Sequence, residues 1–251
     1  MKIWLPLAFL LALLCGLVSQ APANKVLAYA VPAQAPMQIR EVSGRLLEGR
    51  IGYLDAGRLA VEDLDWRLDL WPLLLGRLAA DVELKPAGAW AQGRLSAGLG
   101  GKITVTDLRA TATLENLKKP LNLPFLPVSG QLSAEIERLK IEEQRLVEAH
   151  GTLRLGNTVW SLTRPPAALG LFSATIRTED EAIIADIGDQ DAQLAVSGEA
   201  RLNADQSYLL NLRLKAKADT PAPVANNLKT LGRTDSQGWY QINQRGQLPG
   251  S

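Results

Sequence analysis

The sequence of 251 residues contains one cysteine, Cys15, and one histidine, His150. A single cysteine excludes a disulfide within the chain, and Cys15 lies in an apolar N-terminal run, away from any folded metal site. One histidine excludes a histidine-rich zinc site. The net charge is only +1, and acidic and basic residues are interspersed. Nothing therefore predicts a nucleic-acid surface, which needs clustered Lys and Arg.

Motifs for catalysis and cofactor binding are also missing. The chain has no Gly-x-Ser-x-Gly nucleophile elbow, no phosphate-binding loop and no dinucleotide fingerprint. Acidic residues at 179–181 and at Asp186, Asp189 and Asp191 could bind Ca²⁺, but the EF-hand spacing is absent, and solvated turn acids are the default interpretation. We therefore predict a protein that is not an enzyme, with no catalytic residue, cofactor or metal.

What the sequence does contain is strict alternation. In residues 63–70 charged side chains alternate with apolar ones, and the alternation resumes at 77–85 after Trp71-Pro-Leu-Leu-Leu-Gly76. A period of two is typical of a strand with one buried face, and Pro72 and Gly76 favour a turn between two such strands. The predicted hairpin presents one apolar row as the candidate interaction or groove-lining surface: Leu64, Trp66, Leu68 and Leu70.

Similar alternating segments fill most of the chain and predict a mainly β fold. We expect an extended, curved antiparallel sheet, a meander that either stays continuous or folds into two packed halves. Two strand pairs are expected at Gly151–Gly156 with Val159–Trp160 and at Gly238–Asn243 with Gly246–Leu248. One short helix is expected at 221–231, capped by Asp219 or Thr220. The predicted segments are 1–20 (membrane anchor or signal), 21–38 (linker), 39–119 (first β half) and 120–251 (second β half).

The N-terminal segment is apolar from Ile3 to Val18 and follows Lys2. Its length fits the core of a secretory signal and is slightly short for a spanning helix of about 20 residues. Ala21-Pro-Ala23 has the small-x-small form of a cleavage site. A cleaved signal and an uncleaved anchor with Lys2 in the cytoplasm both fit. Either one carries the rest of the chain across a membrane.

Four stretches together resemble the type II secretion system protein N family. Besides the N-terminal anchor, they are Val42-Ser-Gly-Arg-Leu-Leu-Glu-Gly49, Leu64-Asp-Trp-Arg-Leu68 with Leu73-Leu-Leu-Gly76, and Leu231–Tyr240 with Gly246-Gln-Leu248. The first is similar to the family's Gly-x-Leu-Trp-x-Gly element, with Leu47 where tryptophan is usual.

This resemblance implies a single-pass inner-membrane protein whose bulk lies in the periplasm of a Gram-negative bacterium. It implies an accessory role in exporting folded proteins across the outer membrane, with the secretin and inner-membrane platform subunits as partners. It also favours the uncleaved anchor, and it supplies no catalytic residue.

An AsmA-like lipid-binding or lipid-transfer protein is the alternative. A curved sheet with an apolar concave face can hold acyl chains, and the row from Leu64 to Leu70 would line it. The tryptophans in or beside strands, Trp66, Trp71, Trp90 and Trp160, are expected to pack in the core.

Overall fold

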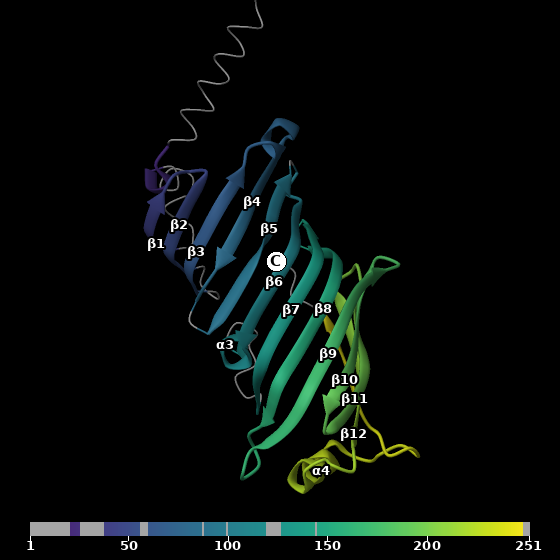
Figure 1. Ribbon diagram of the computed structural model, residues 1–251. Helices are drawn as coiled ribbons and strands as arrows, with labels where there is room; N and C mark the ends of the chain where they lie inside the picture. Colours follow the sequence, from purple (N-terminus) through teal and green to yellow (C-terminus); the bar gives the residue numbers. More distant parts are fainter. Residues whose placement is uncertain are drawn as a thin grey trace, which may run out of the picture.

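The structure is a computed structural model that describes residues 21–25, 38–55, 60–86, 88–98, 100–118, 127–143 and 145–247. Over these ranges the chain forms a single antiparallel sheet of thirteen strands (Figure 1). The strands lie in the sheet in the same order as in the sequence, from β1 to β13. The mainly β prediction is confirmed, and the meander is one continuous sheet, not two packed halves.

The strands lengthen towards the middle of the sheet. Their bounds are β1 Gln38–Gly44, β2 Glu48–Asp55, β3 Ala60–Asp69, β4 Arg77–Leu84, β5 Ala89–Gly98, β6 Ile103–Thr113, β7 Val128–Glu142, β8 Arg145–Trp160, β9 Ala167–Glu179, β10 Ala182–Ala192, β11 Leu194–Leu202, β12 Ser207–Ala216 and β13 Tyr240–Gln247. Four short helical elements connect them: η1 Pro72–Leu75, α3 Leu114–Lys118, α4 Ala222–Leu228 and η2 Lys229–Leu231.

The hairpin of β3 and β4 forms as the alternation predicts. Leu64 pairs with Leu84, Trp66 with Val82, and Leu68 with Ala80, so the apolar residues of both strands share one face. The turn between them is the 3₁₀ helix η1, closed by Gly76 in the left-handed conformation (φ 69°).

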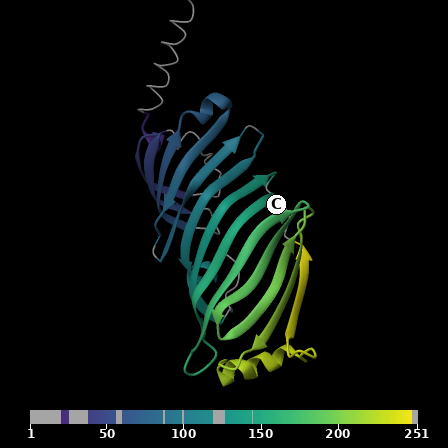
Figure 2. The same cartoon turned by 45° about the vertical axis from the view of Figure 1, so that its right-hand side comes forward.

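Bulges make several strands longer and more twisted than the alternation suggests. Asp107 in β6 and Asn157 in β8 have φ of 52° and 51°, and the strand pairing shifts register beside each of them. A bulge adds a residue on one side of a pair and increases the local twist. The sheet accordingly coils along its length, as the views in Figures 1 and 2 show.

Helix α4 covers part of the apolar face near the C-terminal end of the sheet (Figure 2). Val224 packs against Ala167 and Leu169 of β9, and Leu228 packs against Leu194 and Val196 of β11. Both helix side chains are buried, at 3% and 7% exposure. Their burial explains why a helix of only seven residues is stable here, since isolated short helices are marginal.

The predicted C-terminal helix is confirmed, but its predicted cap is wrong. Pro221 occupies the N-cap position and no side chain caps the helix. Thr220 instead donates its hydroxyl to the Gln193 carbonyl and accepts the Lys217 N–H, so it ties the helix entrance to the β10–β11 turn.

Three further details differ from the sequence-based expectation. Residues 151–156 and 159–160 belong to one strand, β8, because the bulge at Asn157 lets it continue. Tyr240–Gln247 is likewise a single strand paired with β12. Helix α3 was not predicted; its Leu114 is buried against the sheet.

The predicted boundary near residue 120 falls between β6 and β7. These strands pair from Ile103 with Ile141 to Thr113 with Gln131, so the sheet is continuous across that position. The division into halves stays a prediction. The apolar run from Ile3 to Val18 lies outside the described residues, and within the described ones no helix is both long and apolar enough to span a membrane.

Candidate functional site

The candidate apolar row lies on one face of the sheet. Leu64, Trp66 and Leu68 point to the same side of β3, and all three are half-buried. Leu70 follows the last residue of β3, at the entrance to η1, and is also half-buried. The structure therefore brings the first three together with Ala80, Val82 and Leu84 of β4, and it places Leu70 at one end of the row.

Trp66 is held in place by the β1–β2 hairpin. Its indole N–H donates to the Leu46 carbonyl oxygen at 2.9 Å. Its ring lies against Gly49 so closely that a Cβ on Gly49 would come within 2.6 Å of the Trp66 Cη2 atom. Gly44 pairs with Gly49 across the same hairpin. The Gly44-to-Gly49 element thus has a physical role, because its second glycine leaves room for the tryptophan ring of β3.

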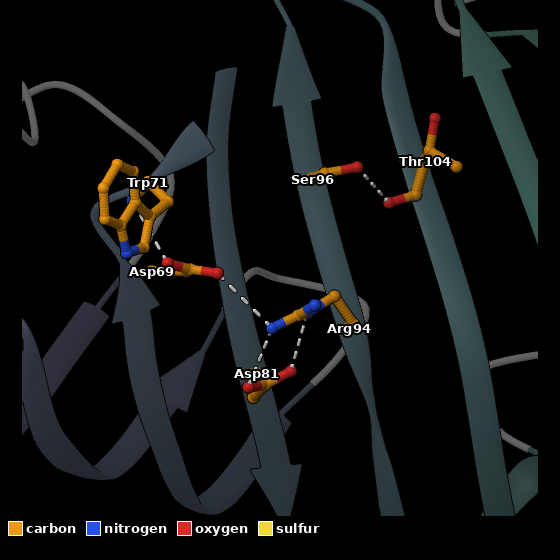
Figure 3. A network of polar contacts seen from close by, with 6 residues as sticks. All are labelled: Asp69, Trp71, Asp81, Arg94, Ser96 and Thr104. Atoms are coloured by element: carbon orange, nitrogen blue, oxygen red, sulfur yellow. Dashed lines mark hydrogen bonds and ion pairs between the residues drawn. The ribbon is translucent and has the colours of Figure 1, made fainter. Parts of the chain in front are cut away.

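The opposite face of β2–β5 carries a ladder of charges. Arg50 contacts Asp63 at 2.6 Å, and Arg67 contacts Glu48 at 3.0 Å. Arg94 of β5 contacts Asp81 of β4 at 3.0 Å and Asp69 of β3 at 3.6 Å (Figure 3). These cross-strand pairs fix the register, because a slip by one residue would place the charges on the apolar face.

Glu83 belongs to the same face and is held in its charged form. The Trp90 indole N–H donates to its carboxylate at 3.1 Å, and Lys85 lies at 3.0 Å. The Trp90 hydrogen bond, followed by that of Lys85, lowers the pKa of Glu83 below its ordinary value.

An open hollow of about 710 Å³ lies on this charged face. Its lining includes Glu48, Arg50, Asp65, Asp81, Gln92 and Arg94. A groove for acyl chains needs an apolar lining. Trp66 and Val82 also line the hollow, but most of its lining side chains are charged or polar, so the hollow gives no support to the lipid-binding alternative. Leu64 and Leu68 are not among its lining residues.

The two ends of the sheet are its edges. In the described part of the chain, β1 pairs only with β2, and β13 only with β12. Strand β1 is interrupted at Glu41, whose φ is 57°. Strand β13 pairs with β12 in unbroken register from Ser207 with Gln247 to Leu214 with Tyr240. A regular edge of this kind exposes backbone groups that can pair with another strand.

Comparison with known proteins decides the family. The family model "Type II secretion system (T2SS), protein N" matches residues 35–243, which include strands β1 to β12 and the first half of β13. The chain belongs to the type II secretion system protein N family. The chain is similar to the type II secretion system protein N of Vibrio cholerae, 26% identical over 96% of this chain and 97% of that protein. It is also similar to the type II secretion system protein N of Aeromonas hydrophila, 26% identical over 98% of this chain and 99% of that protein. The protein N of Pectobacterium carotovorum is 25% identical over 96% of this chain and 95% of that protein.

No solved structure matches the chain. The sheet of this family member is therefore described from its own residues. The sequence resemblance to the protein N family is confirmed, and it rests on the Gly44–Gly49 hairpin, on β3 with its tip, and on the C-terminal segment that contains β13.

The residues considered as catalytic groups or metal ligands lie apart in this protein N family member. His150 is partly exposed on β8, and Glu148 is its nearest carboxylate, at 3.7 Å. Asp186 pairs with Arg177, and Asp189 with Lys217. Among the described residues no group of three or more His, Cys, Asp or Glu side chains is placed to hold a metal.

The tryptophans that were expected in the core lie in different surroundings. Trp66 and Trp160 are half-buried against neighbouring strands, Trp90 is half-buried on the charged face with its indole N–H on Glu83, and Trp71 is 78% exposed. Leu75 beside it is 79% exposed. The sequence of this turn contains no charged residue, and a run of Trp, Pro and Leu without a charge is unusual for a loop in water. That pattern could have indicated an exposed apolar surface at this turn.

Proposed function

We propose that this protein is a non-enzymatic accessory component of the type II protein secretion machinery. The observation that carries the proposal is the family match over residues 35–243, which spans the described sheet from β1 into β13. A large open sheet with a charged face and free edges suits a protein that contacts other subunits. Its proposed partners are the secretin and the inner-membrane platform proteins.

We further propose that the segment 1–20 anchors the chain in the inner membrane and that the sheet lies in the periplasm. The apolar run from Ile3 to Val18 and the preceding Lys2 support this topology. The machinery would then export folded proteins across the outer membrane while this chain holds a fixed position on the inner membrane.

Strand β13 is the proposed contact edge. Its eight residues pair with β12 without a bulge, and five of them have exposed side chains. A strand from another subunit can add to such an edge through backbone hydrogen bonds, as in other cases of β-strand addition. Strand β1 is a poorer edge for the addition of another strand, because the left-handed conformation of Glu41 interrupts its regular backbone.

Site-specific photo-crosslinking in living cells tests this contact. The crosslinker is placed at Gln241 and at Asn243, which are exposed and share the polar face of β13. The matched control is Thr175, which is exposed in the same cross-strand row but on the interior strand β9. We expect adducts with a secretin or platform subunit from both β13 positions and none from Thr175.

The same experiment tests the apolar row. Leu64, Trp66, Leu68 and Leu70 remain proposed as a second interaction surface. A crosslinker at Leu68 that captures a secretion subunit would support this role. Capture of phospholipid alone, from Leu68 and not from Asp65, would replace the proposal with the lipid-binding alternative.

A further inference from the structure

The tip between β3 and β4 exposes three apolar side chains at once. Trp71, Leu73 and Leu75 are 78%, 46% and 79% exposed. The sequence carries no charge between Asp69 and Arg77. Side chains of this size rarely gather on a protein surface unless something other than water covers them.

The tip is held rigidly by its own hydrogen bonds. Asp69 accepts the Trp71 backbone N–H at 3.1 Å, and its other carboxylate oxygen lies 3.6 Å from Arg94 of the charged ladder (Figure 3). At the far side, the Gly76 N–H donates to the carbonyls of η1, including that of Leu73 at 3.0 Å. The backbone that carries the apolar side chains is thus hydrogen-bonded at both ends of the turn.

The apolar surface continues from the tip onto the sheet. Leu78 of β4 pairs with Ala97 of β5, and Ala97 pairs with Ile103 of β6. Leu78 and Ile103 are 45% and 37% exposed, and Leu95 on the same face is 41% exposed. Together with the three tip residues they lie towards a single end of strands β3–β6, and we refer to these six residues as the apolar tip patch.

The N-terminal segment at Ala21 and Pro22 contacts the sheet at this same end. The Leu46 N–H donates to the Ala21 carbonyl at 2.9 Å, and Pro22 bridges to Arg45 in the β1–β2 turn. Leu47 of that turn accepts the Leu68 N–H at 2.7 Å, two residues before the tip begins. Val18, the last residue of the apolar run, lies only three residues before Ala21, a reach of at most about 10 Å.

We propose that the apolar tip patch docks on the surface of the lipid bilayer that holds the N-terminal run. This inference rests on the proposed anchoring of residues 1–20. The short tether keeps the tip close to the headgroups, and an outward-facing Trp with neighbouring Leu side chains suits the boundary between headgroups and acyl chains. The protein then has two membrane contacts, which fix the orientation of the sheet.

Two arginines flank the patch and fit the same surface. Arg45 in the β1–β2 turn and Arg77 at the start of β4 are both exposed. Lys and Arg beside an interfacial segment are attracted to anionic lipid headgroups. Their positions on either side of the tip place positive charge where lipid phosphates would lie.

The test uses the full chain with Cys15→Ser and one new cysteine carrying an environment-sensitive fluorophore. Leu75→Cys labels the tip. The matched control is Leu162→Cys, because Leu162 is 66% exposed but lies in the β8–β9 connection at the opposite end of the strands. Both proteins are inserted in nanodiscs of phosphatidylethanolamine and phosphatidylglycerol, with or without a lipid spin-labelled near the headgroup.

We expect the emission at position 75 to shift to the blue and to be quenched by the spin-labelled lipid, and the emission at position 162 to do neither. Equal emission at both positions, with the protein present in the nanodisc, overturns the docking while leaving the anchor intact. A blue shift without quenching also overturns it, because a protein segment or a second copy then covers the tip. Failure of the unlabelled chain to insert at all contradicts the proposed anchor itself.

Discussion

Gly49 and Trp66 depend on each other at the scale of single residues. The Trp66 ring occupies the space that a side chain on Gly49 would need, and the Ser43 carbonyl oxygen would lie 2.7 Å from the added Cβ. The indole also donates to Leu46, so the ring links β3 to the turn of the neighbouring hairpin. Any side chain at position 49 must therefore displace either the ring or the backbone of β1.

Gly49→Ala is expected to destabilise the protein by about 1–3 kcal/mol, in the range of other overpacking substitutions. Gly188→Ala is the control, because the nearest atom to its added Cβ, the Val196 carbonyl oxygen, is 4.0 Å away. Thermal unfolding of both variants measures the difference. Equal melting temperatures would show that the Trp66 ring moves aside without cost.

Asp189 shows how one half-buried charge couples stability to pH. Burial would raise its pKa, but hydrogen bonds from Lys217 and from the Val196 N–H outweigh burial and lower the pKa of Asp189 below its ordinary value. Lys217 also donates to the Ala192 carbonyl at 2.8 Å, so the pair ties β10 to the chain after β12. The unfolded chain takes up a proton at this group before the folded one does, so the stabilisation is lost as the pH falls.

Asp189→Asn should lower the melting temperature most above about pH 5, where the native carboxylate is charged in both states. The difference in melting temperature from the native protein should begin to shrink as the pH falls below about 4, the ordinary pKa of an aspartate. It should continue to shrink as the pH falls through the lowered pKa of Asp189 in the folded state. Lys217→Gln removes the same ion pair from the other side and should give the same trend. A difference that stays constant over this range would contradict the assignment.

Helix α4 is the element that buries the apolar face at one end of the sheet. Its Val224 and Leu228 cover the apolar face of β9 and β11, where Leu169, Leu194 and Val196 are buried. On the apolar side of strands β3 and β4 the small Ala80 is buried, but the larger residues, such as Trp66 and Val82, are only half-buried. One short helix thus closes the core at one end of the sheet, while the other end keeps its apolar surface open.

Leu228→Ala is expected to cost about 2–4 kcal/mol of unfolding free energy, as other buried leucine truncations do. Leu231→Ala is the matched control, because Leu231 is 44% exposed and its loss should change stability little. Denaturant unfolding of both variants gives the comparison. Similar midpoints for the two would mean that α4 does not contribute to the core.

The elements could be predicted from the sequence where alternation is strict, and less well where a bulge intervenes. The β3–β4 hairpin follows directly from its alternating charges and the Pro72–Gly76 turn. The length of β8 does not, because Asn157 takes a left-handed conformation that lets the strand continue past Gly156. Local pattern also cannot reveal exposure: Trp71 was expected in the core because the sequence does not say which apolar side chains find a partner.

At the scale of the whole molecule, the described residues form a sheet in which each strand pairs only with its neighbours in sequence. The longest strands, β7 and β8 with 15 and 16 residues, lie in the middle, and shorter strands lie at both edges. Stability in such an arrangement comes from neighbour-to-neighbour contacts, much as in a repeat protein. Local opening should therefore begin at the edges.

Hydrogen exchange followed by mass spectrometry measures this gradient. We expect the slowest exchange in β7–β9, and the fastest in β1 and β13, which each have one paired side in the described sheet. The reason is that an edge strand opens by breaking one set of hydrogen bonds and a central strand by breaking two. Uniform protection across all strands would instead indicate a single cooperative unit.

The order of the strands has a consequence for synthesis. Because each strand pairs with the one made just before it, a chain that emerges from its N-terminus never has to wait for a distant segment. At each moment the growing sheet offers one new free edge, which the next strand to be made then covers. The chain can therefore fold progressively as it leaves a ribosome or a translocation channel, and the edge left open at the end is β13.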